Sequence, residues 1–140
     1  MKFEDLQFVR LDKPGLMRFV PRRLFEQVKG HTFNIDKIYE YADAFLVNPS
    51  NRIYALVDNK SKTRGILWAY VNLLTETIQV SILSIDKEFQ FDNALEKTLE
   101  FIKSWMGEDK KLKIECITAR PGAYEKAGWK RSKRIILEID

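Results

Sequence analysis

The sequence predicts a single α+β domain, in which a central mixed and twisted sheet carries helices on both faces. Its 140 residues suffice for one core and not for two, so we treat 1–140 as one domain. Three strand-like runs within 52–85, separated by short polar turns, predict an antiparallel meander. A later helix stands between two strand-like runs, which predicts parallel neighbours joined by a right-handed crossover.

The first forty residues predict one short strand and the start of a helical region. Residues 6–11 could form the strand, and Lys13-Pro14-Gly15 then breaks the chain. Pro21 suits the first turn of a helix that runs to about Lys29 and stops at Gly30.

A second helix follows directly. Asn34 is a good N-cap, because its side chain can accept a hydrogen bond from the first turn. The apolar residues then recur at helical spacing: Ile35, Ile38, Tyr39, Ala42, Phe45 and Leu46. The polar run 48–51 closes the helix as a turn.

The meander comprises strands at 52–57, 65–73 and 77–85, which are rich in apolar and β-branched residues. On the second of these strands, Trp68, Tyr70 and Asn72 share one face. Core packing explains the two aromatic residues, and a wall of a substrate groove is the other explanation.

The last third predicts a crossover helix that starts at Asp92 or Asn93, runs to about Met106 and ends at Gly107. Its inner face comprises Ala94, Leu95, Thr98, Leu99, Ile102 and Trp105. A strand at 112–118, a short helix at 121–127 and a last strand or hairpin arm at 129–139 complete the order β-αα-βββ-α-β-α-β.

Composition excludes several classes of protein. No apolar run approaches the roughly 18 residues that cross a membrane, and no signal peptide is evident. A single cysteine allows no internal disulfide, and with one histidine it leaves no His/Cys metal site. The net charge of +4 could attract an anion, but no recognition pattern for nucleic acid accompanies it.

One motif carries a family resemblance. The run Ala123-Tyr124-Glu125-Lys126-Ala127-Gly128-Trp129 resembles a turn of the GCN5-related N-acetyltransferase (GNAT) superfamily that usually reads Tyr-Glu-Lys-Leu-Gly-Phe. The order of elements is also that of the superfamily. The resemblance implies acetyl-CoA as co-substrate, bound where two parallel strands splay apart. It also implies that Tyr124 protonates the departing CoA thiolate, and the other explanation of Tyr124 is a tyrosine of the core or of a hairpin.

The resemblance assigns the cofactor site to the end of the fourth strand and the loop after it. The superfamily loop reads Gln/Arg-x-x-Gly-x-Gly/Ala, and here it corresponds to Gln90-Phe91-Asp92-Asn93-Ala94-Leu95. Asn tolerates the left-handed backbone that the first glycine adopts. Leu95 replaces a small residue and Asp92 adds a negative charge, so we expect acetyl-CoA to bind weakly or not at all. The expected contacts are Leu83, Ser84, Ile85, Gln90, Phe91, Asp92, Asn93, Ala94 and Leu95.

A general base is harder to find. In superfamily members that use a glutamate on the fourth strand, the matching residue here is Gln79, which accepts no proton. Glu76, at the preceding turn, is the nearest carboxylate and becomes the candidate. Its other explanation is a solvated turn residue. His31 could face a substrate or sit exposed at a helix end, and Cys116 is expected to be a buried small hydrophobe.

Two functions therefore stand open. The first is an acetyl-CoA-dependent N-acetyltransferase that acts on an amine of a small molecule or a protein. The second is a catalytically inactive binding or structural protein of the same fold, for example a phage-associated component. We expect a cytoplasmic protein, or a virion one if phage-encoded, with no membrane partner and a possible homodimer.

Overall fold

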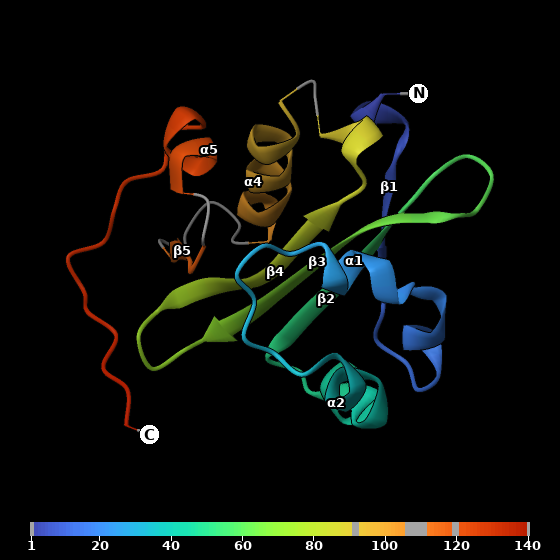
Figure 1. The fold of residues 1–140 in the computed structure, drawn as a ribbon, viewed down its shortest axis with the longest axis horizontal. Coiled ribbons are helices and arrows are strands. Elements are labelled where there is room, and N and C mark those ends of the chain that lie inside the picture. The colour runs from blue at the N-terminus through green and yellow to red at the C-terminus, as the bar shows by residue number, and fades with distance from the viewer. Residues whose placement is uncertain (1, 91–92, 106–111, 119–120, 140) are drawn as a thin grey trace.

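The structure is a computed structural model that describes residues 2–90, 93–105, 112–118 and 121–139 (Figure 1). In this described part, five strands and five α-helices follow one another with three short 3-10 helices between them. In order they are 3-10 helix Phe3–Asp5, β1 (Gln7–Arg10), 3-10 helix Leu16–Phe19, α1 (Arg22–Glu26), α2 (Ile35–Glu40), α3 (Ala42–Val47), β2 (Asn51–Val57), β3 (Thr63–Asn72), β4 (Thr77–Ile85), 3-10 helix Lys87–Phe89, α4 (Ala94–Ser104), β5 (Lys113–Cys116) and α5 (Pro121–Lys126).

The sheet confirms the predicted fold class. Its strands lie in the order β1-β2-β3-β4-β5, and the first four are antiparallel to one another. Strand β5 runs parallel to β4, with Thr77 opposite Lys113 and Val80 opposite Cys116. Helix α4 makes the crossover between these two strands, as the sequence predicted.

Each face of the sheet packs on a separate core, because successive strand side chains point to opposite faces. The side with α1, α2 and α3 buries Leu24, Phe25, Ile53, Ile66, Trp68 and Ile82. The side with α4 buries Leu56, Leu67, Ile78, Val80, Ala94 and Ile102. Figure 1 shows the two groups of helices on opposite sides of the sheet.

The ladder between β3 and β4 contains one irregularity. Trp68 lies opposite Ile82 and Ala69 lies opposite Val80, so Ser81 has no partner on β3. Such a bulge bends the strand and turns a residue outward. The bulge therefore leaves Ser81 exposed beside Ile82, which is buried.

The helical region before the sheet differs from its prediction in detail. The Asn34 carboxamide oxygen accepts a hydrogen bond from the Lys37 backbone N–H at 3.2 Å, which confirms the predicted N-cap. The predicted helix divides into α2 and α3 at Tyr41, whose φ of −105° and ψ of 19° are not helical. In the part of the chain that the structure describes, no helix is long and apolar enough to cross a membrane.

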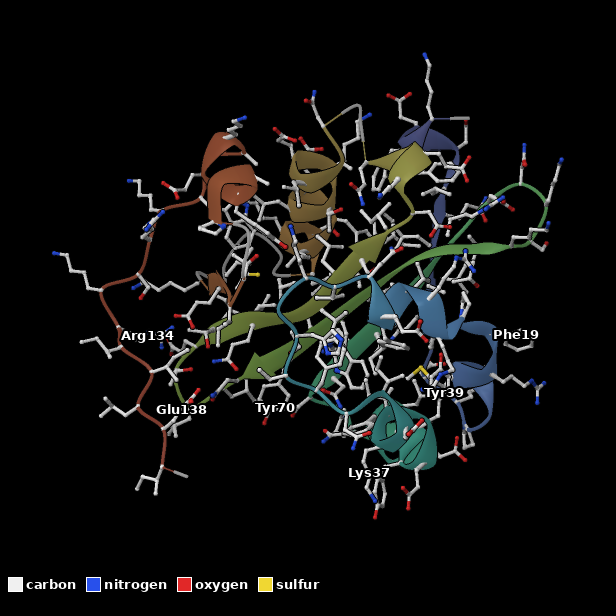
Figure 2. All side chains as sticks on the ribbon, viewed as in Figure 1. Phe19, Lys37, Tyr39, Tyr70, Arg134 and Glu138 are labelled. Carbon is white, nitrogen blue, oxygen red and sulfur yellow. The ribbon has the colours of Figure 1, made fainter. Side chains whose placement is uncertain are left out.

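The prediction of a last strand at 129–139 was wrong, since these residues form no strand. The apolar side chains from Ile135 onward are exposed, with Leu137 at 89% and Ile139 at 100%. Arg134 forms an ion pair with Glu115 of β5, and Figure 2 shows Arg134 and Glu138 at the margin of the molecule. An alternating pattern makes a strand only where a neighbouring backbone supplies hydrogen-bond partners.

Candidate functional site

The parallel pair of strands ends before β4 does. The ladder stops at Val80 and Cys116, whereas β4 continues to Ile85. Within the described part of the chain, no strand pairs with the β5-facing edge of 81–85. Backbone groups on that edge therefore have no strand partner and can bind a ligand, except for the Ile85 carbonyl oxygen, which accepts a hydrogen bond from the Gln90 carboxamide.

Tyr124 lies where this pairing ends, a point that we call the divergence of β4 and β5. It belongs to α5, and its hydroxyl is hydrogen-bonded to the thiol of Cys116, the last residue of β5. Its ring packs edge-to-face on Trp129, with the ring centroids 5.3 Å apart. The turn that carries the family resemblance thus delivers a phenol to the point where the parallel strands separate.

Burial decides the protonation of this pair. It raises the pKa of Tyr124 well above its ordinary value, and the neighbouring Cys116 raises the pKa further. Burial also raises the pKa of the Cys116 thiol, while the hydrogen bond from Tyr124 partly lowers it. The phenol is thus protonated at neutral pH but is a weaker proton donor than an exposed tyrosine, and the thiol is not a ready nucleophile.

The three predicted contacts on β4 hold the strand through their side chains. Leu83 packs against the core beneath α4, and Ile85 is buried. Ser84 is buried too, and its hydroxyl accepts a hydrogen bond of 2.8 Å from the carboxamide of Gln27, the residue that follows α1. These side chains hold the strand in place, and the strand's backbone is what remains open to a ligand.

The predicted loop is partly described. Phe91 and Asp92 lie outside the described residues. Gln90 turns back on the strand, and its carboxamide N–H donates to the Ile85 carbonyl oxygen at 2.7 Å. Asn93 adopts the expected left-handed backbone, with a φ of 60°.

Helix α4 begins directly after Asn93. Ala94 is buried in the core and Leu95 is half-buried. The first N–H groups of a helix have no partner within it, so the start of α4 presents donors to an anion. Glu96 in the first turn places a negative charge near them.

The structure does not bring the two catalytic candidates together. Glu76 is an exposed turn residue with a φ of 53°, and it precedes the start of β4. A strand rises about 3.3 Å per residue, which puts the Glu76 backbone on the order of 13 Å from Val80. Gln79 instead lies close to the divergence, opposite Glu115.

A groove of about 460 Å³ lies beside this point, over β3 and β4, and we call it the acceptor groove. It contains Gln79 and the bulged Ser81. Its walls are Phe33, Ile38, Phe45, Asn48, Asn51, Trp68, Tyr70 and Ile82. Trp68 is both buried in the core and part of the lining of the groove.

His31 and Asn72, both singled out in the sequence, lie outside the lining of the acceptor groove. His31 is exposed and stacks on Phe33, with the ring centroids 4.4 Å apart, so it stands at the margin of the groove. The Asn72 carboxamide accepts a hydrogen bond from the Leu74 backbone at 3.0 Å and belongs to the turn after β3. No metal-binding group of three or more acidic, His or Cys side chains occurs among the residues the structure describes.

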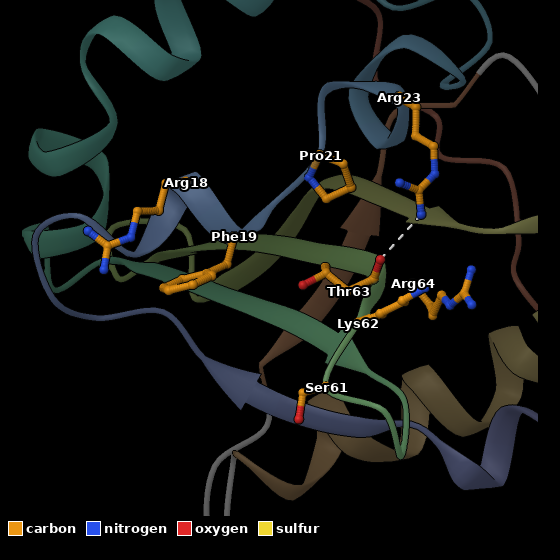
Figure 3. A pocket seen from close by; sticks show the side chains of 8 residues that line it. All are labelled: Arg18, Phe19, Pro21, Arg23, Ser61, Lys62, Thr63 and Arg64. Atoms are coloured by element: carbon orange, nitrogen blue, oxygen red, sulfur yellow. Dashed lines mark hydrogen bonds between the residues drawn. The ribbon is translucent and has the colours of Figure 1, made fainter.

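A second hollow, of about 540 Å³, lies between the start of α1 and the turn before β3, and we call it the basic pocket (Figure 3). Its lining includes Arg18, Arg23, Lys62 and Arg64. The Arg23 guanidinium lies 2.7 Å from the Asp86 carboxylate. Arg64 contacts Asp58 at 2.9 Å, and it also contacts Asp86 and Glu88. Three carboxylates thus largely neutralise these two arginines.

Sequence reasoning missed two features of the site. The bulge at Ser81 gives no signal in the sequence, because Ser is an ordinary residue at an exposed strand position. The Tyr124–Cys116 hydrogen bond joins two residues that the sequence analysis treated separately. The position of Cys116 near the end of the strand predicted at 112–118 was the one available hint.

Comparison with known proteins places the fold. No protein-family model and no curated protein sequence matches the chain. Among solved structures, an aminoglycoside N-acetyltransferase in complex with CoA matches with a TM-score of 0.73 at 10% identity, covering 96% of this chain and 94% of that one. The aminoglycoside 6'-N-acetyltransferase of Acinetobacter baumannii also gives 0.73, at 7% identity and 96% and 97% coverage.

A GNAT family acetyltransferase of Staphylococcus aureus matches with a TM-score of 0.71 at 9% identity, covering 96% of this chain and 98% of the other. Identities this low establish the fold and not the activity. The agreement extends over nearly the whole length of each partner. The chain therefore has the fold of the GNAT acetyltransferases.

Proposed function

We propose that this protein is an acyl-CoA-dependent N-acetyltransferase that transfers an acetyl group to an amine. The observation that carries the proposal is the position of Tyr124. Its protonated phenol lies at the end of β5, where the ladder with β4 stops and the edge of 81–85 becomes open. A thioester lying along that edge would have its sulfur within reach of a proton donor.

The residues present fit acetyl-CoA in part. The open edge of β4 offers backbone groups to the pantetheine amides, and the start of α4 offers N–H donors to the pyrophosphate. Leu83, Ser84, Ile85, Asn93, Ala94 and Leu95 are the described residues that would hold it. Glu96 and half-buried Leu95 oppose it, which is consistent with weak binding.

The reaction needs a neutral amine, an acetyl donor and a proton for the leaving group. Acetyl-CoA supplies the thioester. The amine nitrogen forms a bond to the carbonyl carbon, the carbon–sulfur bond breaks, and the amine gives up one proton. Tyr124 donates a proton to the sulfur, and solvent restores the phenol with the proton that the amine released.

Two structural neighbours support this choice of co-substrate, since they were solved with CoA or with a CoA-based bisubstrate analogue. The competing function is a non-catalytic protein of the same fold. The inward-folded Gln90 and the absence of a carboxylate from the acceptor groove, within the described residues, favour the non-catalytic function.

The deciding experiment is a thermal melt with increasing acetyl-CoA. A ligand that binds only the folded state raises Tm once its concentration exceeds Kd, and we expect a rise at millimolar acetyl-CoA. Leu95→Gly should make the rise in Tm with acetyl-CoA larger, because it removes a bulky side chain at the start of α4. Leu99→Gly, on the same helix, is the matched control for the loss of a helical leucine. If Tm shifts neither in the wild type nor in Leu95→Gly, acetyl transfer is refuted and the non-catalytic function is the one that stands.

A further inference from the structure

The acceptor groove is uncharged. None of its lining side chains is ionised at neutral pH, as far as the described residues go. The carboxylate nearest in register is Glu115, opposite Gln79, but Glu115 is paired with Arg134 and does not line the groove. A polycationic acceptor would need several carboxylates to replace its hydration, and the groove supplies none.

Rings make up much of the groove, and they are held in fixed positions. Phe45 and Trp68 meet edge-to-face with their centroids 5.1 Å apart. The Trp68 indole N–H donates to the Asn51 carboxamide oxygen at 3.4 Å, and the Asn51 amide donates to the Phe45 carbonyl oxygen at 3.0 Å. Preorganised aromatic walls of this kind suit a flat apolar body that can pack against them.

Three neutral polar side chains remain for the ligand. Within the described part of the chain, no hydrogen bond joins the side chains of Tyr70, Gln79 or Ser81 to another group. Gln79 carries an acceptor oxygen that an amine N–H can reach, and it lies next to the divergence of β4 and β5. One amino group could thus be oriented without any charge on the protein.

The uncharged lining also explains why the groove needs no general base. Burial in an uncharged, ring-lined groove disfavours an ammonium ion and lowers the pKa of a bound amine. The groove itself therefore favours the neutral amine, which is the form that attacks a thioester. A carboxylate at position 79 would stabilise the ammonium form as well as accept its proton.

We propose that the acceptor is a small molecule with a single amino group on an aromatic body, and not a polyamine or an aminoglycoside. This inference rests on the proposed acetyl transfer. The volume of about 460 Å³ lies in the range of small-molecule sites. The proposed acceptor class thus differs from the aminoglycosides named for several structural neighbours.

The test compares phenethylamine, spermidine, kanamycin and a short peptide with a free N-terminus. Binding is measured by calorimetry with and without CoA, and acetylation is followed as free thiol released from acetyl-CoA. We expect phenethylamine to bind and react at least about tenfold better than the others, a difference of about 1.4 kcal/mol. A preference for spermidine, kanamycin or the peptide overturns the inference.

A pair of variants tests the groove through a change in acceptor preference, so the absolute affinities of the acceptors need not be known. Ser81→Asp places a carboxylate in the acceptor groove and should shift the preference toward spermidine by about tenfold or more. Ser61→Asp adds the same charge at the basic pocket and should leave the preference unchanged. If Ser81→Asp and Ser61→Asp behave alike, the groove is not the acceptor site.

The two proposals fail in different ways. Binding of phenethylamine without any thiol release, together with the expected effect of Ser81→Asp, supports the groove assignment and refutes acetyl transfer. Thiol release driven by spermidine or kanamycin supports acetyl transfer and refutes the acceptor class. Failure of phenethylamine to bind with or without CoA refutes the acceptor class whatever the outcome of the melt.

Discussion

The two hollows of the molecule are of similar size and opposite character. The basic pocket contains four cationic side chains, two of which are committed to Asp58, Asp86 and Glu88. The acceptor groove contains no ionised side chain in the described residues, yet three of its polar groups have no partner there. On the assignment that we propose, a surplus of charge is a poor guide to the ligand site, and unpaired neutral groups are a better one.

Substitutions at the two hollows should have different effects on stability and on turnover. Groups that already satisfy one another stabilise the fold, and groups that remain unpaired can bind a ligand. Substitutions at the basic pocket should therefore change stability and leave turnover alone. Substitutions near the acceptor groove should do the reverse. Tyr124→Phe, Asp58→Asn and Lys62→Gln test this separation, and Gly65→Ala tests the packing between β3 and β4.

The largest expected effect is that of Tyr124→Phe. A general acid contributes about 10²–10⁴-fold, so turnover should fall by at least about tenfold while Tm barely changes. Tyr41→Phe, at an exposed tyrosine, is the matched control. Steady-state kinetics together with a melt measures both quantities, and an active enzyme indifferent to Tyr124→Phe would remove this residue from the mechanism.

Gly65→Ala should have the largest effect on stability. A Cβ at Gly65 would lie 2.9 Å from the Ser84 carbonyl oxygen and 3.3 Å from the Leu56 Cβ. Overpacking of this kind costs about 1–3 kcal/mol of unfolding free energy, which denaturant titration can measure. Gly122→Ala meets nothing within 4 Å and serves as the control. Equal stability of the two variants would mean that β3 and β4 can separate freely at this point.

Asp58 makes stability depend on pH. Its hydrogen bond from Arg64, and then those from backbone N–H groups, hold the pKa of Asp58 at about 2, below its ordinary value of 3.8. A depressed pKa stabilises the fold above the unfolded pKa, and this contribution is lost as the pH falls from about 4 to about 2.

Asp58→Asn should therefore lower Tm at pH 7 and flatten the acid side of the stability curve. Asp36→Asn, at an exposed carboxylate, is the control. Turnover at neutral pH should not change in either variant. A loss of turnover in Asp58→Asn at temperatures where it stays folded would break the separation between the two hollows.

The smallest expected effect is that of Lys62→Gln. The Lys62 backbone N–H holds Asp58, but its side chain forms no ion pair in the described part of the chain. Removing its charge should shift stability by less than about 0.5 kcal/mol and leave the affinity for acetyl-CoA unchanged. If calorimetry shows a weaker affinity of Lys62→Gln for acetyl-CoA, the basic pocket contributes to binding this anion.

Local patterns in the sequence predicted most of the fold. The meander, the Asn34 cap and the parallel pair follow from periodicity, turn residues and the handedness of crossovers. The break at Tyr41 could not be predicted, because apolar spacing continues across it. The strand expected at 129–139 failed because strand formation depends on a neighbouring backbone, and no spacing in the sequence records that.

The site could be predicted only in part. The motif at Tyr124 and the left-handed Asn93 were both recognisable from residue type. The neutral character of the groove was not, since Phe33, Asn51, Tyr70 and Ser81 come from separate segments that only the folded chain brings together. Glu76 was chosen because it is the carboxylate nearest to Gln79 in the sequence. In the structure it precedes β4, whereas Tyr124 lies further along that strand.

The most direct test of acetyl-CoA binding at the divergence of β4 and β5 follows backbone amide signals of isotope-labelled protein by NMR during titration with acetyl-CoA. We predict that signals shift along Ser81–Ile85 and at Ala94 and Glu96, and that those of Ser61–Arg64 stay in place. Shifts confined to the basic pocket, or none at millimolar acetyl-CoA, would contradict this assignment of the site.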